Sequence, residues 1–262
     1  MKKLIFYIIL GSIVFGETRN WDSHSAYLLH QKRWEMGLFQ PFRYGYSESI
    51  EYSVHPLWFF VIPNFTLKKS QNPIYAFTTA SRYKIFYPTP LLNMVAKDGT
   101  LGIIAPDFQI PPMLGLSASL LLSREIAGFN TTITSGIDLG LVMGELDKRS
   151  TIDLPLIYHR LGIFYNGYGI HVGLDVQKSV TTNLSLLTDF DVRFLPGLKG
   201  NNSVESKFLV AWKKSGRFRI VTGCKLVVGD YPFGTEMRLL PYIPMLEKWV
   251  PIIEFQWAGN KS

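Results

Sequence analysis

The segment 184–194, LSLLTDFDVRF, decides the fold class because its side chains alternate in character along the chain. Its even-numbered positions carry Leu, Thr, Phe and Val, whereas most odd-numbered positions carry Ser, Asp or Arg. A period of two places successive side chains on opposite faces of a β-strand. The segment therefore predicts a long strand with one apolar face and one charged face.

The same period recurs in other parts of the chain. It is strong in segments 170–177, 203–213 and 217–228, weaker in 50–55 and 137–144, and mixed with Ser and Gly in 114–126, where a helix is the alternative. Turn-forming sequences separate the segments, among them Asn166-Gly167 and the runs 196–202 and 213–216. The pattern predicts about twelve strands, within a range of about 10 to 14, and no long helix.

The length of these strands favours a membrane barrel. They run to about ten to twelve residues, whereas typical globular strands have ~5–6 and membrane-crossing strands ~9–11. In lipid, a sheet must close so that every backbone group is paired. The fold class that we expect is all-β, an antiparallel transmembrane up-and-down β-barrel. Aromatic residues at the strand ends support it over a secreted sandwich or lipocalin-like barrel; they are Tyr165, Phe194, Trp212 and Phe218.

Composition excludes several other classes. The chain has 262 residues, 47% hydrophobic and 18% charged, which excludes a disordered chain. Cys224 is the only cysteine, so there is no disulfide scaffold; it falls on the lipid-facing side of its strand. The net charge of +7 is modest, and export argues against a nucleic-acid partner.

The first sixteen residues have the pattern of a secretory signal. Lys2 and Lys3 precede the apolar stretch 4–15, which is too short to span a bilayer as a helix, and the small Gly16 suggests cleavage after it. We expect residues 1–16 to be a signal peptide and residues 17–262 to form the barrel domain. An uncleaved anchor or a buried first strand is the alternative.

The end of the chain predicts an orientation. Segment 250–257 is the expected last strand, and bacterial barrels finish on the periplasmic side with an aromatic-rich strand; here Ala258–Ser262 still follow Trp257. Counting back from this strand assigns each connection to one side. Outer loops are then 229–248, 195–202 and the turn Asn166-Gly167, whereas 213–216 and 180–183 are periplasmic turns.

Four short runs carry a resemblance to a known class. They are Pro41-Phe42-Arg43-Tyr44-Gly45, the run 50–57 (IEYSVHPL), the run 62–65 (IPNF) and the run 231–234 (YPFG). These runs resemble an uncharacterised family of Gram-negative outer-membrane β-barrel proteins. The resemblance implies outer-membrane lipid as the surroundings, and periplasmic chaperones and the barrel-assembly machinery as partners during biogenesis. It implies no activity.

One strand face carries the residue types of nucleophilic catalysis. Ser49, Glu51, Ser53 and His55 follow each other at a spacing of two, so a strand places them on one face. A serine, a histidine and an acid could cleave lipid esters. Neighbours on one strand face lie ~6.5–7 Å apart, however, which is too far for a direct Ser–His hydrogen bond without a favourable rotamer. The alternative is that these residues form a polar row that faces the lumen and bonds to neighbouring residues.

The charged faces of the C-terminal strands predict the lining of the lumen. His171, Asp175 and Asp189 form one expected cluster, either a proton-sensitive or metal site or a structural hydrogen-bond network. The other charges either select anions at a constriction or form salt bridges that fill a narrow barrel. The full lumen-lining set is His171, Asp175, Asp189, Asp191, Arg193, Glu205, Lys207, Arg217, Arg219 and Lys225.

The chain contains no motif of a metalloprotease, a serine-hydrolase elbow or a phosphate-binding loop. We therefore expect no cofactor and no metal. The favoured function is a non-enzymatic outer-membrane barrel, either a narrow pore for small solutes or a structural membrane protein. The alternatives are a lipid-active barrel enzyme of the acyl hydrolase type and a soluble periplasmic lipid-binding barrel.

Overall fold

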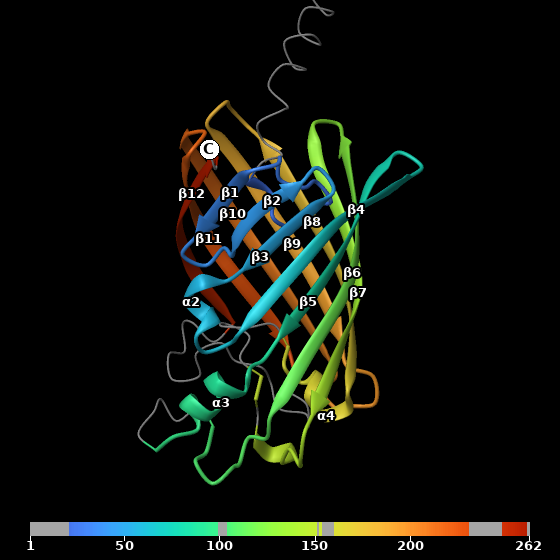
Figure 1. Ribbon diagram of the computed structural model, residues 1–262, viewed down its shortest axis with the longest axis vertical. Helices are drawn as coiled ribbons and strands as arrows, with labels where there is room; N and C mark the ends of the chain where they lie inside the picture. Colours follow the sequence, from blue (N-terminus) through green and yellow to red (C-terminus); the bar gives the residue numbers. More distant parts are fainter. Residues whose placement is uncertain (1–20, 99–103, 151, 154–159, 231–247, 261–262) are drawn as a thin grey trace, which may run out of the picture.

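The computed structural model describes residues 21–98, 104–150, 152–153, 160–230 and 248–260, and shows a closed antiparallel barrel of twelve strands (Figure 1). Each strand pairs with its neighbours in sequence, and β1 closes the ring on β12. The prediction of an all-β up-and-down barrel with about twelve strands is confirmed. The expected signal peptide, residues 1–16, lies outside the described residues.

Nine of the strands are long and three are short. The long strands are β4 (Asn64–Ile74), β5 (Phe77–Phe86), β6 (Met113–Ile126), β7 (Phe129–Val142), β8 (Tyr168–Ser179), β9 (Leu184–Phe194), β10 (Asn202–Ser215), β11 (Phe218–Gly229) and β12 (Trp249–Asn260). The short strands are β1 (Arg33–Gly37), β2 (Phe42–Ser47) and β3 (Ile50–Val54). The segment 114–126 is thus a strand and not a helix, and the segment 184–194 coincides with β9.

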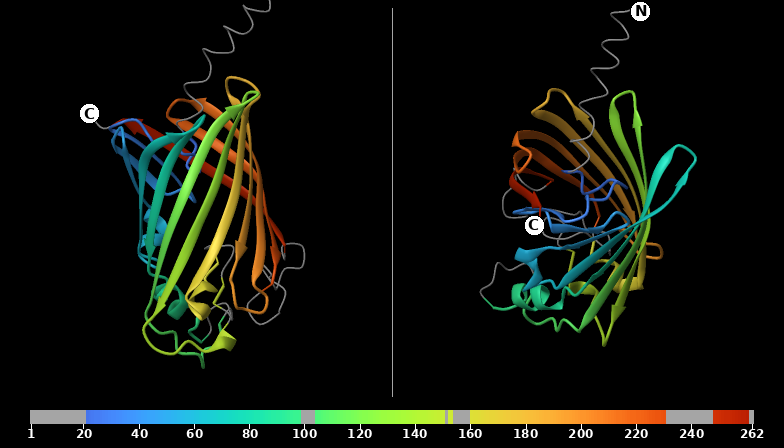
Figure 2. Two further views of the ribbon diagram at one scale, coloured as in Figure 1. Left: turned by 90° about the vertical axis from the view of Figure 1, so that its right-hand side faces the viewer. Right: turned by 45° about the horizontal axis from the view of Figure 1, so that its top comes forward.

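The connections differ between the two ends of the barrel (Figures 1 and 2). At the turn end, the hairpins are closed by two to four residues, and the first residue of β1 pairs with the last residue of β12. At the loop end, the connections are longer and carry α2 (Pro56–Phe59), α3 (Thr89–Val95), η2 (Lys148–Ser150) and α4 (Ile163–Asn166). Of the expected outer loops, 195–201 lies at the loop end, whereas most of 229–248 lies outside the described residues.

The dipeptide Asn166-Gly167, which is predicted to be a turn between two strands, lies directly before β8 but does not close a hairpin by itself. It ends α4 within the long connection between β7 and β8. Gly167 has a φ of +91° and its N–H donates to the Ile163 carbonyl at 2.7 Å. A left-handed glycine closes a helix as readily as it closes a hairpin, so the dipeptide alone does not distinguish the two.

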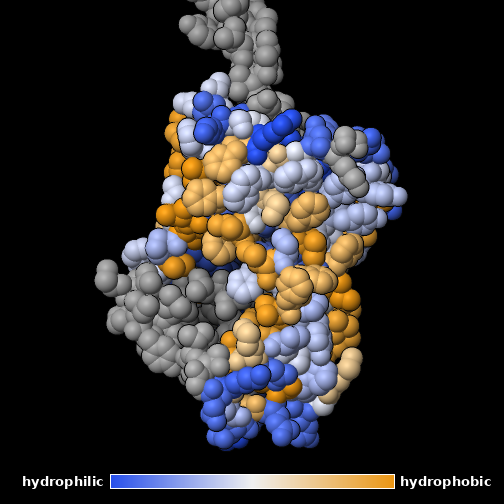
Figure 3. All heavy atoms as spheres, turned by 60° about the vertical axis from the view of Figure 1, so that its left-hand side comes forward, coloured by the Kyte–Doolittle hydropathy of each residue, from blue (hydrophilic) through white to orange (hydrophobic). Residues whose placement is uncertain are grey.

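The two faces of the sheet have opposite character. Apolar side chains such as Phe190 and Phe208 point outward, with 47% and 57% of their surface exposed, whereas Asp189 and Arg219 point inward and are 8% and 5% exposed. The space-filling view shows apolar residues between hydrophilic ends (Figure 3). No helix among the described residues is both long and apolar enough to cross a membrane.

An apolar cluster packs at the loop end. It joins the helices and loops there to the ends of β5 and β6, and Ile62, which follows α2, is fully buried in it. Apolar burial contributes about 25 cal/mol per Å², so this cluster is a substantial source of loop stability. Its buried members are Ile62, Phe86, Leu91, Leu92, Val95, Ala96, Ile104, Ile110, Met113, Ile152, Leu161, Ile163, Phe164 and Leu195.

Candidate functional site

The lumen holds a cavity of about 830 Å³, which is the candidate site. Arg160 and Ile163 from the loop end and Trp21 and Asp22 from the N-terminal part of the chain also line it. Of the residues expected to face the lumen, those that line the cavity are His171, Asp175, Asp189, Asp191, Arg193, Lys207, Arg219 and Lys225.

Two residues of the expected lumen set do not line the cavity. Glu205 is buried and does not border the cavity, but its carboxylate lies 3.0 Å from Lys225 Nζ and 3.8 Å from Arg193 Nε, and both of these cations line the cavity. Arg217 does not line the cavity, because it lies in the β10–β11 turn with an exposed side chain. Strand β11 begins at Phe218, one residue later than the expected segment 217–228, so alternation along the strand does not predict which way the Arg217 side chain points.

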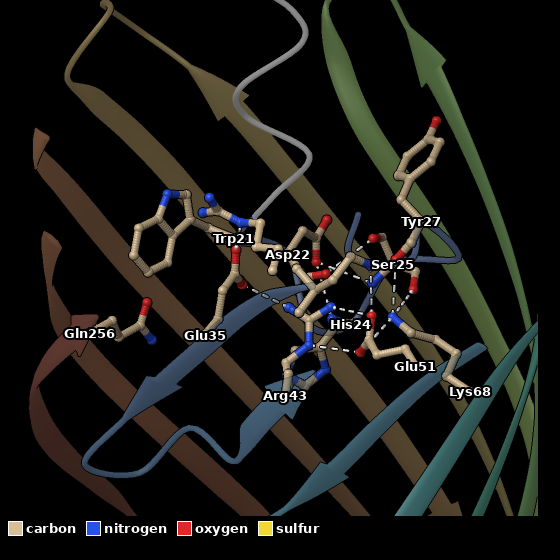
Figure 4. A network of polar contacts seen from close by, with 12 residues as sticks. Trp21, Asp22, His24, Ser25, Tyr27, Glu35, Arg43, Glu51, Lys68 and Gln256 are labelled. Carbon is tan, nitrogen blue, oxygen red and sulfur yellow. Dashed lines mark hydrogen bonds and ion pairs between the residues drawn. The ribbon is translucent and has the colours of Figure 1, made fainter. Parts of the chain in front are cut away.

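Residues 21–30, the inner segment, cross the lumen at the turn end (Figure 4). Ser25 and Ala26 are completely buried, and Leu29 is 1% exposed. Trp21 lies close to two guanidinium groups, with the Cζ of Arg219 5.0 Å and the Cζ of Arg33 5.5 Å from its ring centroid. Sequence reasoning missed this segment, because its ten residues follow neither a strand nor a helix period.

The contacts of the inner segment extend around the barrel. Lys68 on β4 donates to the carbonyls of Ser25 and Tyr27 at 3.1 and 3.0 Å. On the far side, Asn130 on β7 donates to Asp22 at 3.2 Å, and Arg219 on β11 donates to the Trp21 carbonyl at 2.9 Å. The segment is therefore fixed to opposite walls and obstructs the turn end of the lumen.

Glu51 belongs to an ion network that supports the inner segment. Arg43 donates to both of its carboxylate oxygens, at 2.8 and 3.0 Å, and the Leu29 amide donates to it at 2.9 Å. Arg43 also contacts Glu35 at 3.1 Å, and Lys68 lies 3.6 Å from Glu51. All of its near contacts are with cations and the backbone, so this carboxylate is structural.

The expected group Ser49, Glu51, Ser53 and His55 is not brought together. Strand β3 ends at Val54, so His55 leaves the strand face and caps α2 through its Nδ1, which accepts from Trp58 N at 3.4 Å. The other ring nitrogen, Nε2, lies 2.9 Å from the Phe39 carbonyl. Partial burial lowers the pKa of His55, against the opposing effect of the bond to Phe39. Ser49 lies in the exposed β2–β3 turn.

The expected cluster of His171, Asp175 and Asp189 is also divided. Asp189 pairs with Lys207, and Asp175 lies 3.6 Å from His24 of the inner segment. The ring nitrogens of His171 instead contact Ser119 and Asp138. No group of three metal-binding side chains occurs among the described residues.

His171 joins Ser119 to Asp138. Its Nε2 lies 3.1 Å from Ser119 Oγ, and its Nδ1 lies 2.9 Å from Asp138 Oδ2. Because an ionised carboxylate only accepts, Nδ1 carries the hydrogen and Nε2 accepts from the serine. All three side chains line the cavity. Sequence reasoning missed Ser119 and Asp138, because positions 119, 138 and 171 are far apart in the chain.

Gly136 makes this arrangement possible. The register aligns Ser119 with Gly136 on β7, and Gly136 with His171 on β8. The His171 ring occupies the space that a side chain at Gly136 would need. A Cβ on Gly136 would lie 2.5 Å from Cε1 of this ring and 2.6 Å from its Nε2. Asp138 is two residues further along β7 and so shares the lumen face.

The cavity has a cationic part and an apolar part. Arg82, Lys84 and Arg193 line it close to Ser119, and the register places Arg82 directly opposite Ser119 on the neighbouring strand. The apolar part lies along the segment of β12 that extends beyond β1, which pairs only with positions 256–260. Its lining includes Phe39, Trp58, Val250, Pro251 and Ile252.

Arg160 has hydrogen-bonding capacity left over. Its Nε donates to Asp153 at 2.9 Å, and its side chain is 1% exposed. Both of its terminal nitrogens, Nη1 and Nη2, are buried without a hydrogen-bond partner among the described residues. A buried guanidinium with unused donors is suited to a carboxylate or phosphate ligand.

Comparison with known proteins adds no family. No protein-family model matches the chain, and no curated sequence matches it significantly.

Proposed function

We propose that the chain is an outer-membrane β-barrel whose lumen is a closed polar chamber. The observation that carries the proposal is the division of side chains, apolar outside and charged inside. The apolar outer face can contact lipid acyl chains, whereas the charged inner face needs water or ion pairs. A soluble barrel has the opposite arrangement, with its apolar side chains inside.

The connections support an orientation. Outer-membrane barrels have short periplasmic turns and longer extracellular loops. The turn end, with the paired termini of β1 and β12, is then periplasmic, and the loop end with its apolar cluster is extracellular. Outer-membrane lipid surrounds the strands, and assembly uses periplasmic chaperones and the barrel-assembly machinery.

The inner segment argues against a permanently open pore. It crosses the lumen and contacts strands on opposite sides of the barrel. In this proposal, a narrow pore exists only when the inner segment leaves the lumen. The wild-type protein in a planar bilayer is then silent for most of the recording.

Fractionation and conductance test the proposal together. We expect the protein to resist carbonate extraction and to show heat-modifiable migration on a gel; extractable protein would favour a soluble carrier and overturn the membrane assignment. Lys68→Met removes two anchors of the inner segment and should raise the frequency of channel openings. The matched control is Lys69→Met, because Lys69 is exposed on the opposite face of β4. Stable open channels in the wild type would contradict the closed chamber.

A further inference from the structure

The arrangement of Ser119, His171 and Asp138 is that of a nucleophile, a general base and the group that orients the base. The serine oxygen lies 3.1 Å from one ring nitrogen and the carboxylate 2.9 Å from the other. A catalytic triad is recognised by this geometry and not by sequence order. The residues come from three consecutive strands of a rigid sheet, β6, β7 and β8, which fixes their mutual positions.

We propose that Ser119, His171 and Asp138 hydrolyse carboxylic esters of an anionic amphiphile inside the chamber. Ser119 and His171 are the catalytic residues, and Asp138 is a positioning residue that holds the Nδ1–H tautomer. Ser117, which the register places opposite Asp138, lies on the same lumen face. The inference rests on the proposed function for its substrate source, namely lipid, but not for its chemistry.

The reaction needs only the ester and water. Ser119 Oγ bonds to the ester carbonyl carbon while its proton moves to His171 Nε2. The bond from that carbon to the alkoxy oxygen then breaks, and the alcohol leaves with the proton from Nε2. Water attacks the acyl-serine, again losing a proton to Nε2, and the carboxylic acid departs as the proton returns to Ser119.

Arg82 is placed to stabilise the oxyanion that forms in both steps. It faces Ser119 across the β5–β6 pair, and directly opposed side chains have Cβ atoms ~4.5–5.5 Å apart. Its guanidinium lines the same cavity, where donors aimed at developing negative charge have their largest effect. The backbone amides of the sheet are already paired in the ladder, so a side-chain donor takes this role.

Two features of the cavity define the substrate class. The unused Nη1 and Nη2 of Arg160 fit an anionic group, since a buried guanidinium gains most from a carboxylate or phosphate. The apolar side chains Phe39, Trp58 and Ile252, which also line the cavity, fit an acyl chain. An ester with one anionic group and one apolar chain matches both.

A covalent probe tests the triad in the intact protein. The folded wild-type barrel in detergent is treated with an alkyl fluorophosphonate, which reacts with activated serines, and the labelled peptide is identified by mass spectrometry. We expect the label on Ser119. His171→Asn should slow labelling by about 100-fold or more, the usual contribution of a general base. The matched control is Ser135→Ala, because Ser135 lies on the outer face of β7 and should leave labelling unchanged.

Hydrolysis provides the second readout. Octanoyl ester hydrolysis, followed with p-nitrophenyl octanoate, should vanish in Ser119→Ala, while heat-modifiable migration shows that the barrel is still folded. Asp138→Asn should lower kcat and alter the pH profile, which a merely structural aspartate would not do. A folded wild type that carries no label on Ser119, or Ser119→Ala with full activity, overturns the inference. So does a label that depends on Ser53.

The two proposals fail separately. A carbonate-extractable protein that is still labelled on Ser119 would refute the membrane assignment and support the triad. A membrane-embedded protein with an unreactive Ser119 would refute the triad alone.

Discussion

The substitution Glu51→Ala tests how the inner segment is held, because this carboxylate joins the barrel wall to it. Glu51 accepts from Arg43 at 2.8 and 3.0 Å and from the Leu29 amide at 2.9 Å. Removing one partner of a buried ion pair costs about 3–5 kcal/mol, so we expect the free energy of unfolding to fall by about this amount. A buried amide left without an acceptor costs about 1–3 kcal/mol. Detachment of the inner segment should therefore become about 5- to 150-fold more frequent.

Two assays separate the global from the local effect. Urea unfolding of the barrel in lipid vesicles measures the loss of global stability. The rate of chymotrypsin cleavage after Tyr27 measures how often the inner segment detaches, because cleavage follows the detached population when reattachment is fast. The matched control is Glu48→Ala, since Glu48 is exposed in the β2–β3 turn and should change stability by less than about 0.5 kcal/mol. Equal unfolding and cleavage in Glu51→Ala and Glu48→Ala would refute the role of this network.

Two further substitutions test the outer face and the triad. Phe208→Arg should impair folding into vesicles, because a charge that faces the bilayer centre costs about 2–4 kcal/mol. Leu209→Arg should cost much less, because Leu209 faces the lumen. Equal costs of the two substitutions would contradict the assignment of the faces. Gly136→Ala should displace the ring of His171 and abolish labelling of Ser119 in a barrel that still migrates as folded. The control is Gly216→Ala, because a Cβ added at Gly216 meets no atom within 4 Å. Unchanged labelling in Gly136→Ala would show that the His171 ring does not need the space left by the missing side chain of Gly136.

The strand pattern was available from the sequence because it is a local property. In segments such as 184–194, alternation fixes which side chains share a face, and segment length sets how far each strand runs. His55 shows the limit of this reasoning: it continues the alternation of β3, but the chain turns into α2 at that point. Pro56 ends the strand there, since it supplies no amide hydrogen for the ladder.

The candidate site depended on properties that no short segment carries. In the sequence, nothing distinguishes Ser119, Asp138 and His171 from other lumen residues. Only the register across β6, β7 and β8 brings them together, with Gly136 lying between Ser119 and His171. The inner segment likewise has no pattern of its own, since its structure is set by groups on opposite walls.

The amino-acid order by itself determined that this chain is a barrel, about how many strands it has, and which face is charged in strands such as β9, β10 and β11. Tertiary structure alone decided which charges meet, that residues 21–30 cross the lumen, and that a serine, a histidine and an aspartate share hydrogen bonds. The physical reason is that a side chain's face follows from parity within one strand, whereas its partners follow from the register and closure of the whole sheet.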